Sequence, residues 1–216
     1  MKQQHTTFTS GNLKLEGVLY LPEGSGPFPA VIICHPHPLY GGSMDNNVVD
    51  AVCEALVQAS IAAFKFNFRG VGRSQGRYEE GRVEGEDAKN AVKYVSELKE
   101  VDAKRVGLCG YSAGAAFSLP ACCADEHIAA IAAISPPLAM FDFSCIADCA
   151  KPLLLVSGSR DDFTPADRFS AFCKNLGNTA EHELIEGADH FWGGYEPELA
   201  ARVAAFFAKA MADGNP

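Results

Sequence analysis

The chain has 216 residues, of which 48% are hydrophobic and 21% are charged, a composition typical of a globular protein, with one domain expected over residues 1–216. Its 18 lysines and arginines against 27 aspartates and glutamates leave a net charge of −9 at pH 7, which argues against nucleic acid and membrane surfaces as partners. No apolar run is long enough to span a membrane, and the segment Met1–Lys14 lacks the apolar stretch of a signal peptide, so we expect a cytoplasmic protein.

The predicted elements begin with two strands, His5–Thr9 and Leu13–Leu21, which flank a turn and predict a hairpin at the edge of a sheet. Beyond them, short apolar runs alternate with longer amphipathic stretches, which is the pattern of a mostly parallel sheet with helices on both faces. The further expected strands are Ala30–Cys34, Ile61–Phe66, Arg105–Cys109, Ile128–Ile134, Leu153–Ser157 and Glu181–Ile185. The expected helices are Asn47–Gln58, Gly85–Leu98, Ala113–Cys123, Pro165–Asn175 and Pro197–Ala210. Since proline lacks an N–H group, Pro120 is expected to bend or shorten the third helix.

The eight cysteines lie mostly within apolar segments, where cysteine behaves as a small hydrophobic residue, so we expect reduced thiols. No pair has the Cys-x-x-Cys spacing of a metal site, and the adjacent Cys122 and Cys123 would point to different sides of a helix. The sequence therefore predicts no metal and no other cofactor.

A G-x-S-x-G motif at residues 110–114 stands between a predicted buried strand and a predicted helix. This context is typical of a nucleophile elbow, a strained turn that exposes a serine hydroxyl above the edge of a sheet. Ser112 is therefore the candidate nucleophile. The alternative is an ordinary strand-to-helix turn in which Ser112 caps the helix, because serine is a preferred capping residue.

An activated serine needs a histidine to take its proton and a carboxylate to orient that histidine. Three of the six histidines follow Ser112 in the chain, and only His190 lies in a loop directly after the last predicted strand. Because this loop starts at the carboxyl ends of the strands, where the elbow also lies, His190 is the candidate base. The candidate acids are Asp161 and Asp162, after the strand Leu153–Ser157, and Asp142, after the preceding strand.

The loop after the strand Ala30–Cys34 opens with His-Pro-His-Pro at residues 35–38. A tetrahedral oxyanion needs two backbone N–H donors, one from the residue after the nucleophile and one from this loop. Ala113 supplies the first, and His37, between two prolines that have no N–H group, is expected to supply the second. A metal bound by His35 and His37 is the alternative, but no third ligand is evident.

These motifs resemble the α/β-hydrolase superfamily, and within it the small lidless bacterial hydrolases that carry HPHP-x-x-GG-x-M-x-N near their start. The similarity extends over nearly the whole chain, through the strings NFRGVGRSQG, GYSAG, SPP, GSRDDFTP and GADHF. The resemblance implies an α/β-hydrolase fold without a large cap domain, carboxylesterase-type chemistry, and a triad of Ser112, Asp161 and His190. Asn67 departs from it, since many relatives in the superfamily have Asp there, and we expect this change to affect packing rather than catalysis.

Two clusters in the sequence bear on the substrate. The expected walls of an acyl pocket are Tyr40, Met44, Leu138, Met140, Phe141, Phe143 and Trp192. The apolar segment 138–143 could instead be the first turn of a small helix that packs on the core. Four arginines could bind an anionic group, or could pair with the acidic residues that follow them, and these are Arg69, Arg73, Arg77 and Arg82.

The sequence thus predicts a serine hydrolase, monomeric or dimeric, that cleaves small carboxylic esters with short acyl chains through an acyl-enzyme. A thioesterase or an acyl-peptide hydrolase would use the same residues and remains an alternative. The alternative outside enzymes is a hydrolase-fold binding protein that has lost its activity.

Overall fold

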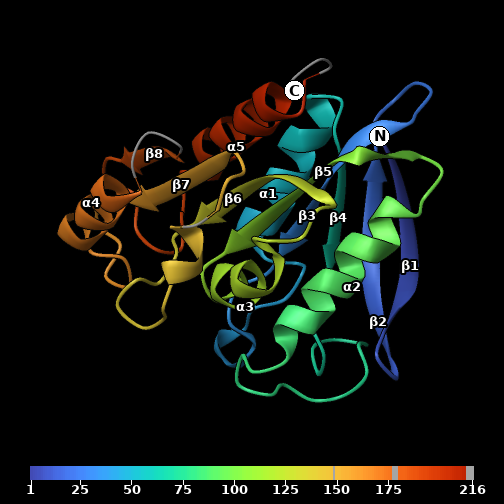
Figure 1. Ribbon diagram of the computed structural model, residues 1–216, viewed down its shortest axis with the longest axis horizontal. Helices are drawn as coiled ribbons and strands as arrows, with labels where there is room; N and C mark the ends of the chain where they lie inside the picture. Colours follow the sequence, from blue (N-terminus) through green and yellow to red (C-terminus); the bar gives the residue numbers. More distant parts are fainter. Residues whose placement is uncertain (148, 177–179, 213–216) are drawn as a thin grey trace.

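The computed structural model describes residues 1–147, 149–176 and 180–212. In this part of the chain the strands form one sheet with the order β1-β2-β4-β3-β5-β6-β7-β8 (Figure 1). Their bounds are β1 Lys2–Ser10, β2 Leu13–Leu21, β3 Phe28–Cys34, β4 Ala62–Phe66, β5 Val101–Tyr111, β6 Ile128–Ile134, β7 Leu153–Gly158 and β8 Ala180–Ile185. The hairpin β1–β2 and the β2–β4 pair are antiparallel, and all other neighbours are parallel. The expected mostly parallel sheet with an antiparallel N-terminal hairpin is confirmed.

The helices cover both faces of this sheet (Figure 1). Their bounds are α1 Asn47–Gln58, α2 Glu84–Ser96, α3 Ala113–Cys122, α4 Ala166–Asn175 and α5 Glu196–Ala210, with short 3-10 helices at Pro38–Tyr40 and Ser144–Ile146. Alternating side chains of β3 enter two core layers: Val31 and Ile33 pack with α1 and α5, whereas Ile32 packs with α2, α3 and α4. A strand buried on both faces has no polar side, which is why its sequence reads as a continuous apolar run.

The observed elements differ from the expected ones mainly at their ends. The strand predicted at Arg105 begins at Val101, because Val101 pairs with Phe28 across a register shift. α3 ends at Cys122, two residues after Pro120, in line with the missing N–H group of proline. β8 is an edge strand with exposed residues and is less apolar than the central strands.

Three further features of the fold bear on the expectations from the sequence: the cap domain, membrane-spanning helices and the cysteines. Among the described residues, no separate cap domain is inserted between the strands. None of the described helices combines the length and the apolar character that a membrane span requires. All eight cysteines lie in the described ranges as free thiols, and only Cys145 is more than marginally exposed.

Candidate active site

The turn between β5 and α3 places Ser112 at the carboxyl edge of the sheet. Ser112 has φ 54° and ψ −124°, a conformation that non-glycine residues rarely adopt and that occurs at functional sites. A Cβ atom on Gly110 would collide with the backbone of Ala115, and one on Gly114 would collide with the carbonyl oxygens of Cys34 and His35. The Ser112 side chain makes no capping hydrogen bond to a described residue. The turn therefore has the geometry of a nucleophile elbow, and not that of a capped helix start.

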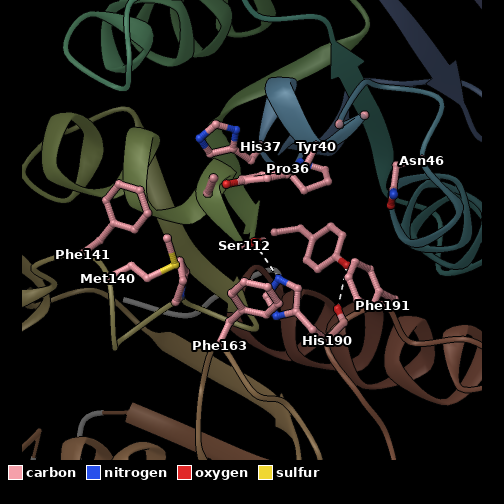
Figure 2. A pocket seen from close by; sticks show the side chains of 15 residues that line it. Pro36, His37, Tyr40, Asn46, Ser112, Met140, Phe141, Phe163, His190 and Phe191 are labelled. Carbon is pink, nitrogen blue, oxygen red and sulfur yellow. Dashed lines mark hydrogen bonds between the residues drawn. The ribbon is translucent and has the colours of Figure 1, made fainter.

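Ser112, His190 and Asp161 form one chain of hydrogen bonds (Figure 2). Ser112 Oγ lies 2.8 Å from His190 Nε2, and His190 Nδ1 lies 2.9 Å from each carboxylate oxygen of Asp161. All three residues are buried. The structure thus brings together the three residues that the sequence indicated, in the contacts that a serine nucleophile, its base and an orienting carboxylate require.

The other candidate residues lie elsewhere. Asp162 is exposed, and exposed Asp142 accepts hydrogen bonds from Ser144. His127 pairs with Asp125 on the surface, and His182 lies on the exposed side of β8. Among the described residues, none of these four is hydrogen-bonded to Ser112 or to His190, whereas His190 contacts the Ser112 hydroxyl and Asp161 contacts His190.

Asp161 is held as a carboxylate by donors from several elements. Burial alone would raise its pKa, but the hydrogen bond and charge of His190, together with donors from Ser135 and Thr164, hold the pKa below its ordinary value. The N–H groups of Phe163 and Thr164 donate to Oδ1 at 2.9 and 3.0 Å. Ionised Asp161 can therefore fix the orientation of the His190 ring and stabilise its protonated form.

Ser135, which directly follows β6, is the least expected of these donors. It is fully buried with φ 45°, and its Oγ accepts a hydrogen bond of 3.1 Å from the Trp192 indole N–H. Because that bond occupies a lone pair of Oγ, the hydroxyl proton is free to be donated to Asp161. Trp192, Ser135 and Asp161 thus extend the hydrogen-bond chain inward from His190.

The His-Pro-His-Pro loop is held by both of its histidine rings. His35 is fully buried; its Nδ1 donates to the Pro36 carbonyl at 2.7 Å, and its Nε2 accepts from the Phe68 N–H at 3.2 Å. His37 Nδ1 accepts from the Leu39 N–H, and its Nε2 lies 3.0 Å from the Tyr78 hydroxyl. Both rings are engaged by the protein, and the described residues contain no group of three metal-ligating side chains.

Two backbone N–H groups beside Ser112 are available to a ligand. In the described part of the chain, the N–H groups of His37 and Ala113 have no hydrogen-bond acceptor, and both residues line the cavity at Ser112. Pro36 and Pro38 carry no N–H group, and the N–H groups of Gly41 and Gly42 donate within the loop. Both N–H groups are therefore available at the cavity, and they belong to the two residues expected from the sequence to supply the oxyanion donors.

The cavity at Ser112 has a volume of about 370 Å³. Its lining comprises Pro36, His37, Tyr40, Gly41, Gly42, Asn46, Tyr111, Ser112, Ala113, Pro137, Met140, Phe141, Phe163, His190 and Phe191. Of the expected pocket residues, Tyr40, Met140 and Phe141 are present. Phe163 and Phe191 are additional wall residues. Their signal in the sequence is their position, since Phe163 lies two residues after Asp161 and Phe191 directly follows His190.

Four of the expected pocket residues do not line the cavity, and each packs in the core instead. Trp192 and Met44 are buried with α1 and α5, and Phe143 is buried with α3. Leu138 is half-buried against that same layer. The N–H groups of residues 140 and 141 both donate to the Pro137 carbonyl, and this helical turn directs 140 and 141 to the cavity while Leu138 and Phe143 face the core.

The four arginines expected either to bind an anion or to pair with carboxylates do the latter. Arg69 pairs with Asp87, Arg73 with Glu16, Arg77 with Glu79 and Arg82 with Glu80. None of them lines the cavity at Ser112.

Asn67 has a role in packing, as expected. Its side chain accepts a hydrogen bond from the Met44 N–H and donates one to Glu16 at 2.8 Å. An aspartate at this buried position would place two carboxylates together, so the amide suits its neighbour Glu16.

The mostly parallel sheet and the serine between β5 and α3 define the α/β-hydrolase fold. A model of the family described as alpha/beta hydrolase domain matches residues 30–199. An uncharacterised protein of Rickettsia prowazekii is 33% identical over 187 residues, which span 83% of this chain and 78% of that one.

Solved structures agree with this assignment. An α/β serine hydrolase homologue from Coxiella burnetii is 32% identical, with a TM-score of 0.85 over 95% of this chain and 97% of that one. A serine hydrolase without a lid from Xanthomonas campestris is 26% identical, with a TM-score of 0.87 over 100% of this chain and 98% of that one. The chain therefore belongs to the α/β-hydrolase family.

Proposed function

We propose that this protein is a serine hydrolase that cleaves small carboxylic esters through a triad of Ser112, His190 and Asp161. The observation that carries the proposal is the continuous hydrogen-bond chain from the strained Ser112 through His190 to Asp161. This chain opens onto an apolar cavity beside two unpaired backbone N–H groups. A nucleophile, a base and oxyanion donors around one point are the parts that acyl transfer requires.

In the proposed reaction, His190 Nε2 takes the Ser112 proton as Oγ attacks the ester carbonyl. Asp161 stabilises the protonated ring, and the His37 and Ala113 N–H groups hold the oxyanion. The protonated His190 then gives its proton to the leaving alcohol, which leaves an acyl group on Ser112. A water molecule, deprotonated by His190, attacks the acyl-enzyme in the same way and releases the acid.

The cavity favours short acyl chains. Its 370 Å³ lies near the lower end of the range for small-molecule sites, and among the described residues no cap domain extends it. Each buried methylene contributes about 0.8 kcal/mol, so selectivity should rise only while further methylenes are still buried.

The test is labelling of the purified protein with a fluorophosphonate probe, followed by mass spectrometry, together with hydrolysis of p-nitrophenyl butyrate. We expect the label on Ser112 and hydrolysis by the wild type, with both lost in Ser112→Ala. A wild type that is neither labelled nor active would instead favour a binding protein with a hydrolase fold.

A further inference from the structure

The charges around Ser112 point to a substrate class, an inference that rests on the proposed function. We propose that the site selects substrates that are uncharged on both sides of the scissile carbonyl and rejects those with phosphate-bearing leaving groups, such as coenzyme A thioesters. This selection separates neutral esters and thioesters from acyl-coenzyme A, which the shared triad chemistry does not distinguish.

The first support is the lining of the cavity, to which the described part of the chain contributes no lysine, arginine, aspartate or glutamate. Its polar side chains belong to neutral residue types and to the two histidines, His37 and His190. Burial lowers the pKa of His37, and its Nδ1 accepts a hydrogen bond, so this ring is neutral near pH 7. An anionic group that entered the cavity would lose its hydration without gaining a cationic partner.

The second support is a set of three exposed aspartates beside lining residues. Asp142 follows Phe141, Asp162 precedes Phe163, and Asp189 precedes His190, whereas the fourth neighbouring aspartate, Asp45, is paired with Lys65. Each aspartate therefore comes from a different segment that forms the cavity. Arg160 is exposed on the Asp161 loop but is not among the lining residues. Because these exposed carboxylates outnumber the exposed Arg160, they repel a polyanion as it approaches the cavity.

The third support is that the nearby arginines are already neutralised. Arg69 and Arg73 are held by the buried carboxylates of Asp87 and Glu16. The exposed Arg77 and Arg82 pair with glutamates two residues away. Charges paired in this way contribute little to the binding of a second anion.

The fourth support is an apolar rim on both sides of the serine. Four lining residues are exposed large apolar side chains: Tyr40, Met140, Phe163 and Phe191. Met140 lies with Phe141 on one side of Ser112, and Phe191 lies with Asn46 on the other (Figure 2). The acyl group and the leaving group thus both meet apolar surface, and on neither side do the described lining residues include a lysine or arginine to bind phosphate.

The experiment compares two thioesters with the same acyl group and the same local thiol structure, S-butyryl-N-acetylcysteamine and butyryl-coenzyme A. Methyl 4-butyryloxybenzoate and 4-butyryloxybenzoic acid form a matching oxyester pair that differs in a carboxylate. We expect kcat/KM for the neutral member of each cleaved pair to be higher, by at least about tenfold for the thioesters at low ionic strength. The difference should shrink in 1 M NaCl, where charges are screened beyond about 3 Å.

A charge-reversed variant locates the effect. Asp162→Lys should raise the ratio of anionic to neutral kcat/KM several-fold, whereas Glu54→Lys, the same charge change at an exposed position on α1, should leave that ratio unchanged. Equal or faster cleavage of the anionic member, or a difference that salt does not reduce, would overturn the proposed charge selection while leaving the hydrolase assignment intact. If Ser112→Ala hydrolyses p-nitrophenyl butyrate as fast as the wild type, the proposed function itself fails.

Discussion

The buried His35 should make the stability of the folded protein fall as pH is lowered from 6.5 to 4. Burial lowers the pKa of His35 from its ordinary value of 6.5 to about 4. Protonation of Nε2 would break the hydrogen bond from the Phe68 N–H and leave a charge in the core. Between these two pH values the unfolded chain binds the proton and the folded chain does not, so unfolding is favoured as pH falls. At about 1.4 kcal/mol per pKa unit, the free energy of unfolding should drop by about 3 kcal/mol.

Urea unfolding followed by circular dichroism between pH 7.5 and 4 measures this loss. The control is His35→Gln, whose amide can still accept a hydrogen bond from Phe68 but does not titrate. We expect this variant to be less stable at pH 7.5 and to lose about 3 kcal/mol less than the wild type on acidification. His37 shifts in the same direction and is present in both proteins, so the comparison isolates His35. Equal pH dependence in the two proteins would refute the reasoning.

The remaining predictions concern activity, measured with p-nitrophenyl esters. Asp161→Asn should lower kcat by about 10⁴-fold, because its amide favours the wrong tautomer of His190, while Asp162→Asn should change kcat little. Comparable losses of kcat in the two variants would contradict the assignment of Asp161 as the residue that orients His190. Ser112→Ala and His190→Ala should each abolish nearly all activity, and the double variant should be little worse, since the triad acts as one unit; losses that multiply would contradict this. The kcat/KM of the wild type should fall on the acid side of its pH profile, because a protonated His190 cannot accept the Ser112 proton. Ser135→Ala removes a donor from Asp161 and should move this limb to higher pH; an unchanged profile would mean that Ser135 only supports the fold. Selectivity should rise from acetyl to butyryl and then fall, without a jump at the solubility limit of the substrate; continued increase to dodecanoyl would reveal a deeper site.

Local patterns were sufficient for the fold. Strands such as β3 and β6 are apolar on both faces because helices cover both, and this leaves an unmistakable run such as Ile128–Ile134. The loops that carry Asp161 and His190 each follow a predicted strand, and parallel strands present their carboxyl ends at one edge of a sheet. The sequence therefore predicted that these two residues lie at the same edge.

The walls of the cavity were less accessible to sequence reasoning. Side-chain direction depends on the conformation of each loop, and a single turn directs Met140 to the cavity and Phe143 to the core. Trp192 has φ 63° and turns into the core, where it supports Ser135. No local pattern indicates a left-handed tryptophan, and the inner hydrogen-bond chain behind Asp161 was therefore visible only in three dimensions.

Tyr111 has a consequence for how the site responds to a substrate. It precedes Ser112, and its hydroxyl donates a hydrogen bond of 2.7 Å to the carbonyl of His190. This hydrogen bond joins the segment that carries the nucleophile directly to the segment that carries the base. A displacement of the loop between β8 and α5 would therefore have to break the Tyr111–His190 hydrogen bond. We therefore expect little rearrangement between the free protein and an acyl-enzyme, with the machinery assembled before the substrate arrives and no energy of closure to supply during turnover.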